Sequence, residues 1–206
     1  MPALYVLGGA NGAGKTTWYQ LGILNKSINQ ALPFINTDLI VLNELGGYTA
    51  ENLVSAEHIA RARIKELLGE RKDFMIESNL SKSADYDWIA LMRKNGYETI
   101  LFFLGTNDVE INKNRVKARI LEGGHAVADP IIEQRYLMGL SYLKSKVLEF
   151  SDVTLVDVSG HVPLRVAQLK NGQIIYKDAE CPSWVQTALD LAERVELRRG
   201  TTPPMS

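Results

Sequence analysis

Gly9-Ala10-Asn11-Gly12-Ala13-Gly14-Lys15-Thr16 is the stretch that decides the fold of this chain. It follows the apolar run of residues 4–7 and precedes a stretch compatible with a helix. Glycines at this spacing let backbone N–H groups curl around phosphate oxygens, and the N-terminus of the following helix adds partial positive charge. Lys15 can then reach the β- and γ-phosphates, and Thr16 offers a hydroxyl ligand to Mg²⁺. The stretch, continued by Thr17, predicts a nucleoside triphosphate site; an incidental glycine-rich turn is the alternative.

Composition sets the outer limits of the interpretation. The 206 residues carry 46% hydrophobic side chains and a net charge of −1, which is ordinary for a globular protein and argues against a generic nucleic-acid binder. Cys181 is the only cysteine, so no disulfide can form within the chain, and we expect a cytoplasmic protein with no membrane segment. We expect one domain over residues 1–196 and a disordered tail over residues 197–206.

The pattern along the chain predicts an α/β fold. Strand-like apolar runs occupy residues 4–7, 33–36, 74–76, 99–104 and 153–156. Helical patterns occupy residues 15–24, 50–68, 84–94 and 109–122, and a pair of helices is predicted over residues 131–148. Strands that alternate with helices build a mainly parallel sheet with helices on both faces. The sequence therefore predicts a P-loop NTPase of the nucleotide-kinase type, a three-layer sandwich.

The C-terminal part is predicted to add a hairpin and a helix. Residues 166–170 and 173–176 flank Asn171-Gly172, a strong signal for a two-residue hairpin turn. Pro182 is a suitable start for a last helix through Arg194.

Two carboxylates follow predicted strands, at the edge of the sheet where ligands bind in open α/β folds. Asp38 follows the second apolar run and Glu77 follows the third. A carboxylate there can hold Mg²⁺ or accept a proton from an attacking hydroxyl. The alternatives are a helix N-cap for Asp38 and an exposed strand-end charge for Glu77. Asn79 after Glu77 either lines a substrate pocket or caps the next helix.

A lid is predicted over about residues 108–140. Arg115 and Arg119 share one helix face, Gly123-Gly124 offers a hinge, and Arg135 lies on the returning helix. Arginines on a closing segment can neutralise the charge of a transferring phosphoryl group. A solvated helix with an Arg119–Glu122 pair is the alternative, and His125 is interpreted as a residue that shapes the loop.

The order of several blocks resembles the zeta-toxin-like family of P-loop kinases, in its compact stand-alone branch, from residue 4 to about residue 184. Besides the loop at residues 9–16, the matching blocks are Asn36-Thr37-Asp38, Glu77-Ser78-Asn79-Leu80-Ser81, Arg115-Val116-Lys117-Ala118-Arg119, Gly123-Gly124-His125-Ala126-Val127 and Arg135-Tyr136.

The resemblance implies an ATP- and Mg²⁺-dependent kinase. In it Asp38 would be the base on a substrate hydroxyl, Glu77 and Asn79 would face the substrate, and Arg119 and Arg135 would be the lid arginines. Family toxins phosphorylate a sugar hydroxyl of a UDP-activated amino sugar, and a small antitoxin holds them in check. The resemblance thus implies a UDP-sugar or nucleotide-like acceptor and an antitoxin partner.

Three positions depart from the family pattern. Asn79 replaces a threonine in the pocket that faces the substrate, and Ala128 replaces a proline after the Gly-Gly-His block. Asp157-Val158-Ser159 stands where an Asp-Asn-Ser-like element near the adenine is common. These changes leave the phosphate chemistry intact and affect the identity of the substrate.

Other functions compatible with a phosphate-binding loop require motifs of their own. A GTPase switch needs an Asn-Lys-x-Asp element, and Asn25-Lys26-Ser27-Ile28 lacks its aspartate. A transporter-type ATPase needs a Leu-Ser-Gly-Gly-Gln-like signature, which the chain lacks. Two readings stay open: a polynucleotide 5′-hydroxyl kinase that uses the same loop, base and lid, and an interaction protein in which the nucleotide is only a structural or regulatory ligand.

Overall fold

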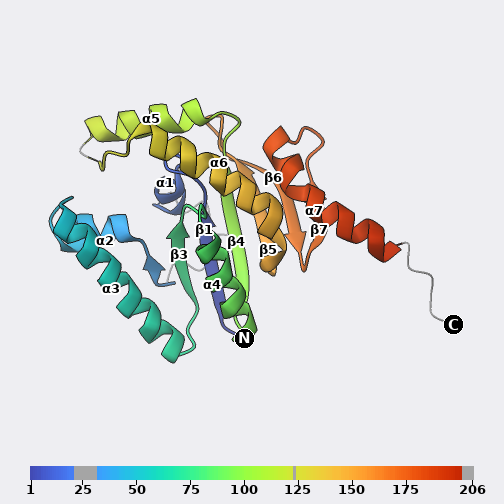
Figure 1. Cartoon of the computed structure of the whole chain (residues 1–206), viewed down its shortest axis with the longest axis horizontal. Helices are drawn as coiled ribbons and strands as arrows, with labels where there is room; N and C mark the ends of the chain where they lie inside the picture. The colour runs from blue at the N-terminus through green and yellow to red at the C-terminus, as the bar shows by residue number, and fades with distance from the viewer. Residues whose placement is uncertain (21–31, 123, 201–206) are drawn as a thin grey trace.

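The computed structural model describes residues 1–20, 32–122 and 124–200, and shows a seven-stranded sheet with helices packed against it (Figure 1). The strand order is β2-β3-β1-β4-β5-β6-β7, and the first five are parallel to one another. The strands are β1 Ala3–Gly8, β2 Phe34–Ile35, β3 Phe74–Ser78, β4 Glu98–Gly105, β5 Asp152–Asp157, β6 Leu164–Lys170 and β7 Gln173–Lys177. This arrangement confirms the predicted α/β fold with a mainly parallel sheet.

Most of the helices lie where the sequence pattern predicts them. They are α1 Lys15–Gln20, α2 Thr37–Glu44, α3 Ala50–Gly69, α4 Ser83–Lys94, α5 Val109–Leu121, α6 Asp129–Lys146 and α7 Ser183–Gly200, with a 3₁₀ turn at Val147–Glu149. The predicted end of the first helix at Leu24 and the Asn25-Lys26 stretch lie outside the described residues. Helix α7 continues to Gly200, beyond its predicted end at Arg194.

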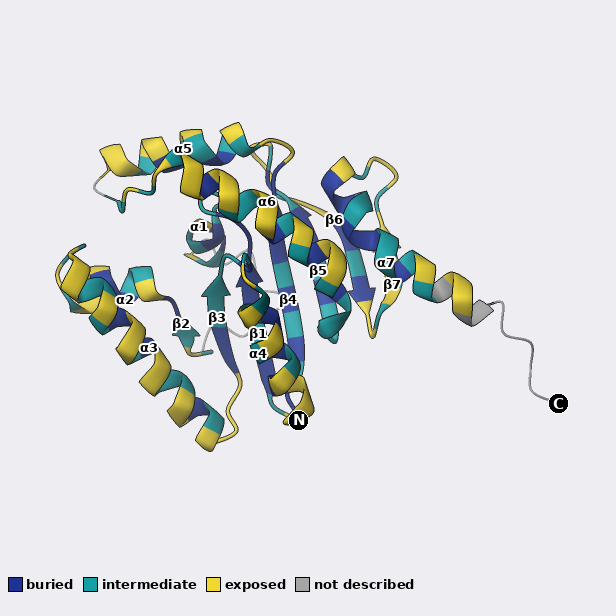
Figure 2. Ribbon diagram, viewed as in Figure 1, coloured by how far each residue is buried: buried dark blue, intermediate teal, exposed yellow. Residues whose placement is uncertain are grey.

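Two hydrophobic cores cover the two faces of the sheet. Consecutive residues of a strand point to opposite faces, so Val6 of β1 joins one core and Leu7 joins the other. Helices α3, α4, α6 and α7 contribute to the first core, and Trp18 of α1 packs in the second. Figure 2 shows that β1 and β4 are mostly buried, while the outer faces of the helices are exposed. The sheet is therefore the middle layer of three.

The C-terminal hairpin is confirmed. Strands β6 and β7 pair antiparallel, and β6 adds to β5 at the edge of the parallel sheet. Asn171 and Gly172 have φ values of 49° and 76°, the left-handed backbone that a tight hairpin turn between twisted strands requires.

The predicted helix pair over residues 131–148 is wrong, because the chain forms the single helix α6. Gly139 does not break this helix. It lies buried where α6 passes over the turn after β3, and a Cβ there would touch the backbone oxygen of Asn79 at 3.4 Å. A Cβ at that distance makes an ordinary van der Waals contact, so α6 packs on this turn without requiring a glycine at position 139.

Helix α5 and the start of α6 lie beyond the carboxyl ends of the parallel strands (Figure 1). They run antiparallel as the two arms of the predicted lid and are joined by residues 122–128. Within the ranges 1–20, 32–122 and 124–200, no helix combines the length and apolar character needed to cross a membrane.

Candidate functional site

The loop between β1 and α1 takes the conformation that its glycines permit. Gly9, Gly12 and Gly14 have φ values of 136°, 76° and 78°, which side-chain-bearing residues rarely adopt. A Cβ on Gly9 would run into the backbone oxygen of Leu104, and a Cβ on Gly12 would run into that of Asn112. A Cβ on Gly14 would have no atom within 4 Å. The loop is therefore packed closely on β4 and α5 at its first two glycines only.

This difference predicts unequal costs for two alanine substitutions. Gly12→Ala combines backbone strain with a clash and should lower the free energy of unfolding by about 1–3 kcal/mol. Gly14→Ala carries the strain alone and should cost about 1 kcal/mol. Chemical denaturation of both variants measures the difference, and equal losses would mean that the contact with Asn112 does not constrain the loop.

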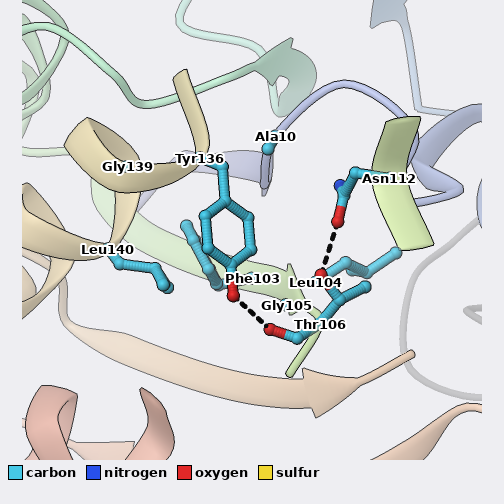
Figure 3. A pocket seen from close by; sticks show the side chains of 9 residues that line it. All are labelled: Ala10, Phe103, Leu104, Gly105, Thr106, Asn112, Tyr136, Gly139 and Leu140. Atoms are coloured by element: carbon cyan, nitrogen blue, oxygen red, sulfur yellow. Dashed lines mark hydrogen bonds between the residues drawn. The ribbon is translucent and has the colours of Figure 1, made fainter. Parts of the chain in front are cut away.

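A buried asparagine supports the loop from α5. The Asn112 side chain donates from Nδ2 to Asn11 O at 2.7 Å, and its Oδ1 accepts from the Thr106 hydroxyl. Tyr136 of α6 donates from its hydroxyl to Thr106 O at 2.8 Å (Figure 3). Both lid helices are therefore hydrogen-bonded to Thr106, the residue that follows β4. A cavity of about 10 Å³, large enough for one water, lies between them. Sequence reasoning missed Asn112, which no short motif marks.

Lys15 lies at the centre of the loop and is almost fully buried. Its Nζ donates to Gly9 O at 2.6 Å and to Ala10 O at 3.1 Å, and it lies 3.3 Å from Asn79 Oδ1 and 3.5 Å from Glu77 Oε1. Burial lowers the pKa of Lys15 below its ordinary 10.5, although the Glu77 carboxylate opposes that shift. A triphosphate would add its negative charge to that of Glu77 around this ammonium.

The lowered pKa of Lys15 predicts proton uptake when the nucleotide binds. Phosphate oxygens raise the pKa of the ammonium, so between its free and bound pKa values the complex holds more protons than the free protein. Affinity for ATP should therefore fall as the pH rises through the pKa of free Lys15, below 10.5. Calorimetry in buffers of different ionisation enthalpy measures the uptake. Lys15→Met should remove the alkaline uptake, and its persistence in that variant would assign it to another group.

Glu77 contacts two of the predicted site residues, Lys15 and Thr16, and also Asn36. Its Oε2 accepts from Thr16 Oγ1 at 3.2 Å and from Asn36 Nδ2 at 2.5 Å, and its other oxygen faces Lys15. The alternative that Glu77 is an exposed strand-end charge is wrong, since only 17% of the side chain is exposed. Two hard oxygen donors, from Thr16 and Glu77, thus lie together beside the loop.

Asp38 stands in the first turn of α2, next to this cluster. The helix is capped by Asn36, whose side chain accepts from Leu39 N at 3.0 Å, so the alternative of Asp38 as the N-cap is wrong. Asp38 is half-buried and its charge acts on the pKa of Lys15. Its carboxylate therefore lies within electrostatic range of Lys15 and does not cap the helix.

The turn after β3 places the Asn79 side chain beside Lys15 of the phosphate-binding loop. Leu80 has a left-handed backbone, with φ of 51°, and a fully buried side chain, and its N–H donates to Ser78 Oγ at 3.0 Å. A bulky residue held at positive φ marks strain that the surroundings maintain. Here the strain turns Asn79 toward Lys15, so the interpretation of Asn79 as a cap for α4 is wrong.

Arg119 and Arg135 converge on the site from the two arms of the lid. Arg119 donates from Nη2 to His125 O at 2.9 Å, and its charge acts on the pKa of Lys15. Its Nε is buried and has no hydrogen-bond partner within the described part of the chain. Arg135 donates from Nη1 to Asn11 Oδ1 at 2.9 Å. The predicted hinge residue Gly123 lies outside the described residues.

Arg115 points elsewhere. Its Nη2 donates to Val158 O at 2.7 Å and to Gly160 O at 3.3 Å, which anchors the loop after β5 to α5. This is the segment where the resemblance places contacts to the adenine. The structure therefore separates Arg115 from the two lid arginines that approach the phosphate end.

A second cavity, of about 140 Å³, opens between the end of β3 and α4. It is lined by Ile76, Ser78, Leu80, Ala84, Asp85, Trp88 and Ile89. Two of these residues, Ser78 and Leu80, are the neighbours of Asn79 in the sequence. Among residues 1–20, 32–122 and 124–200, no group of three or more His, Cys, Asp or Glu side chains is arranged to hold a metal ion by protein ligands alone.

No protein-family model matches the sequence. An uncharacterized protein of Haemophilus influenzae (strain ATCC 51907 / DSM 11121 / KW20 / Rd) is 33% identical over 135 residues, which are 62% of this chain and 88% of that protein.

Several solved structures share the fold. A chain of the AvrRxo1-ORF1:AvrRxo1-ORF2 complex with ATP aligns with a TM-score of 0.67 and 17% identity, over 100% of this chain and 65% of that chain. A chain of the PezAT toxin-antitoxin system of Streptococcus pneumoniae aligns with a TM-score of 0.55 and 15% identity, over 98% of this chain and 88% of that chain. A chain of the Pnkp1/Rnl/Hen1 RNA repair complex aligns with a TM-score of 0.55 and 19% identity, over 80% of this chain and 48% of that chain. These likenesses confirm, for the fold, the resemblance to zeta-toxin-like P-loop kinases.

Proposed function

This chain belongs to the family of the uncharacterized Haemophilus influenzae protein, and we propose that it is a kinase that transfers the γ-phosphoryl group of ATP to a hydroxyl of a small acceptor. One observation carries the proposal. Around Lys15 of the phosphate-binding loop lie the Asp38 carboxylate and Arg119, and the Arg119 Nε is buried without a hydrogen-bond partner among the described residues. These are the parts that phosphoryl transfer needs: a cradle, a base and a positive charge over the transferring group.

The nucleotide would lie along the loop and α1. Backbone N–H groups of residues 9–16 and the side chains of Lys15, Thr16 and Thr17 would bind its phosphates. Arg135 fixes Asn11 and would approach the same phosphates, while Arg115 shapes the 158–160 segment for the adenine. The similar chain solved with ATP supports the choice of nucleotide.

Mg²⁺ fits the donor set at Thr16 and Glu77. A hydroxyl and a carboxylate oxygen 3.2 Å apart are hard ligands. They are too few to hold the ion alone, as expected for a magnesium ion that also binds substrate phosphates and water. When bound, the ion would neutralise charge on the β- and γ-phosphates.

Asp38 would act as the base. As the acceptor oxygen bonds to the γ-phosphorus and the bond from that phosphorus to the ADP oxygen breaks, Asp38 takes the hydroxyl proton. Arg119 would stabilise the charge spread over the transferring group. Because the transition state is loose, the proton leaves late, and orientation of the hydroxyl matters more than basicity.

The acceptor is proposed to be nucleotide-like or a UDP-sugar, bound between Asn79 and the cavity beside α4. That cavity, of about 140 Å³, has mainly apolar walls and room for one small ring of a substrate. The resemblance to zeta-type toxins supports this acceptor class. A toxin role restrained by an antitoxin is part of the proposal, and it draws support from the two-component assemblies of AvrRxo1 and PezAT.

A polynucleotide 5′-hydroxyl kinase is the second candidate, favoured by the likeness to a chain of the RNA repair complex. The net charge of −1 speaks against a long nucleic-acid footprint. An interaction protein that binds the nucleotide without transferring its phosphate is the third.

A panel of acceptors separates these functions. The protein is incubated with Mg²⁺, γ-labelled ATP and, in turn, UDP-sugars, nucleosides, dinucleotide cofactors and 5′-hydroxyl RNA. Label on a small molecule supports the proposal, and label on the RNA alone supports the second candidate. Binding of ATP with label on no acceptor would favour the interaction protein.

A further inference from the structure

Tyr48 is an aromatic residue beside the site that sequence reasoning did not select. It lies in the loop between α2 and α3, directly after Gly46 and Gly47, whose φ values are 78° and 136°. Asn52 Nδ2 holds this loop by donating to Leu45 O at 2.9 Å and to Gly47 O at 2.8 Å. The loop is therefore a fixed support that presents the Tyr48 ring.

The Tyr48 ring stacks on His125 of the lid. The ring centroids are 4.6 Å apart and the planes meet at 25°, and both side chains are half-buried. One ring comes from the loop that follows the helix of Asp38, and the other from the segment that joins α5 to α6. The stack is thus a contact between the two sides of the site.

His125 in turn fixes Arg119. Its carbonyl accepts from Arg119 Nη2 at 2.9 Å, and Gly124 N donates to Arg119 O at 2.9 Å. A Cβ on Gly124 would come within 2.6 Å of Arg119 Cγ. Gly124 and His125 thus pack closely against the arginine, so the position of the His125 carbonyl helps to fix the guanidinium.

The Tyr48 phenol shares the electrostatic field of the site. Burial raises the pKa of Tyr48 to about 12, the Asp38 charge adds to the rise, and the Arg119 charge opposes it. Asp38 and Arg119 therefore each lie within electrostatic range of the Tyr48 hydroxyl, which places the stack near the proposed base and the lid arginine.

We propose that Tyr48 and His125 form an aromatic clasp that positions Arg119 over the phosphate end of the site. Tyr48 is then a positioning residue that acts through His125. The proposal rests on the kinase function proposed above, and it makes the loop after α2 part of the lid mechanism. Offset aromatic pairs of this kind shift a conformational equilibrium by up to about tenfold.

Hydrogen exchange of the lid tests the clasp without requiring phosphoryl transfer. The backbone amides of residues 119–128 are followed in the full chain with Mg²⁺ and a non-hydrolysable ATP analogue. Tyr48→Leu and His125→Ala should each speed their exchange by up to about tenfold, and the double variant should add little to either change. Tyr48→Phe and His125→Phe keep the rings and should preserve the protection. Tyr176→Leu, which removes a ring from the hairpin, is the control.

Kinetics distinguish positioning from a structural role. With an acceptor from the panel, Tyr48→Leu should lower kcat and leave the dissociation constant for the nucleotide unchanged, and Tyr48→Phe should restore kcat. Unchanged lid exchange in both ring-deleted variants would overturn the clasp. Equal damage from Tyr48→Phe and Tyr48→Leu would also overturn it, because the hydroxyl would then matter instead of the ring. A protein that transfers no phosphate yet loses lid protection in Tyr48→Leu would contradict the kinase function and leave the clasp supported.

Discussion

Asp38→Asn should lower phosphoryl transfer by about 100-fold or more while the affinity for ATP stays within about twofold. The amide keeps the size and position of the side chain in the first turn of α2, because Asn36 and not Asp38 caps that helix. It cannot take the proton of the acceptor hydroxyl. A positioned general base contributes about 10²–10⁴-fold to a rate, and this sets the expected loss.

Single-turnover transfer and equilibrium binding of a nucleotide analogue measure the two quantities separately. Asp190→Asn, the same change on the half-buried face of α7, is the matched control and should behave like the parent. A fully active Asp38→Asn variant would refute the assignment of the base. Loss of both binding and transfer would show that Asp38 acts on the nucleotide instead of the acceptor.

Lys15→Met should lower the rate of phosphoryl transfer by about 100- to 1000-fold or more. The variant should not be less stable than the parent protein. The ammonium is buried in the free protein with a lowered pKa, so its charged form is desolvated at a cost. Methionine fills a similar volume without that charge. Glu77 keeps its hydrogen bonds from Thr16 and Asn36, so its carboxylate is not left without partners.

Thermal unfolding of the free protein measures the stability of this variant. Because burial lowers the pKa of Lys15 in the folded state, the lysine opposes folding at every pH below its ordinary 10.5, so the melting temperature of the variant should be equal or higher at neutral pH. Lys65→Met, on the exposed face of α3, is the control for the change in composition. A drop of many degrees for Lys15→Met alone would mean that the lysine holds the loop together by its bonds to Gly9 and Ala10.

The sequence could predict the parts of the site that follow directly from strands. The loop at residues 9–16, Asp38 and Glu77 each come within a few residues of a buried run, so local pattern and the rule for parallel sheets were enough to place them. The hairpin at Asn171-Gly172 followed in the same way, because the turn residues carry the signal themselves.

Other features depend on tertiary packing and left no local signal. Tyr48 and His125 are 77 positions apart in the sequence and meet only when the lid folds over the loop after α2. Asn79 turns toward Lys15 only because Leu80 adopts a strained backbone.

The fate of the γ-phosphate tests the central claim most directly. Phosphorus NMR of the reaction with ATP, Mg²⁺ and the acceptor panel separates a phosphomonoester on an acceptor from inorganic phosphate. We expect one new phosphomonoester signal that grows together with ADP in the parent protein and is missing with Asp38→Asn. Release of inorganic phosphate alone, at the same rate in both proteins, would contradict the account.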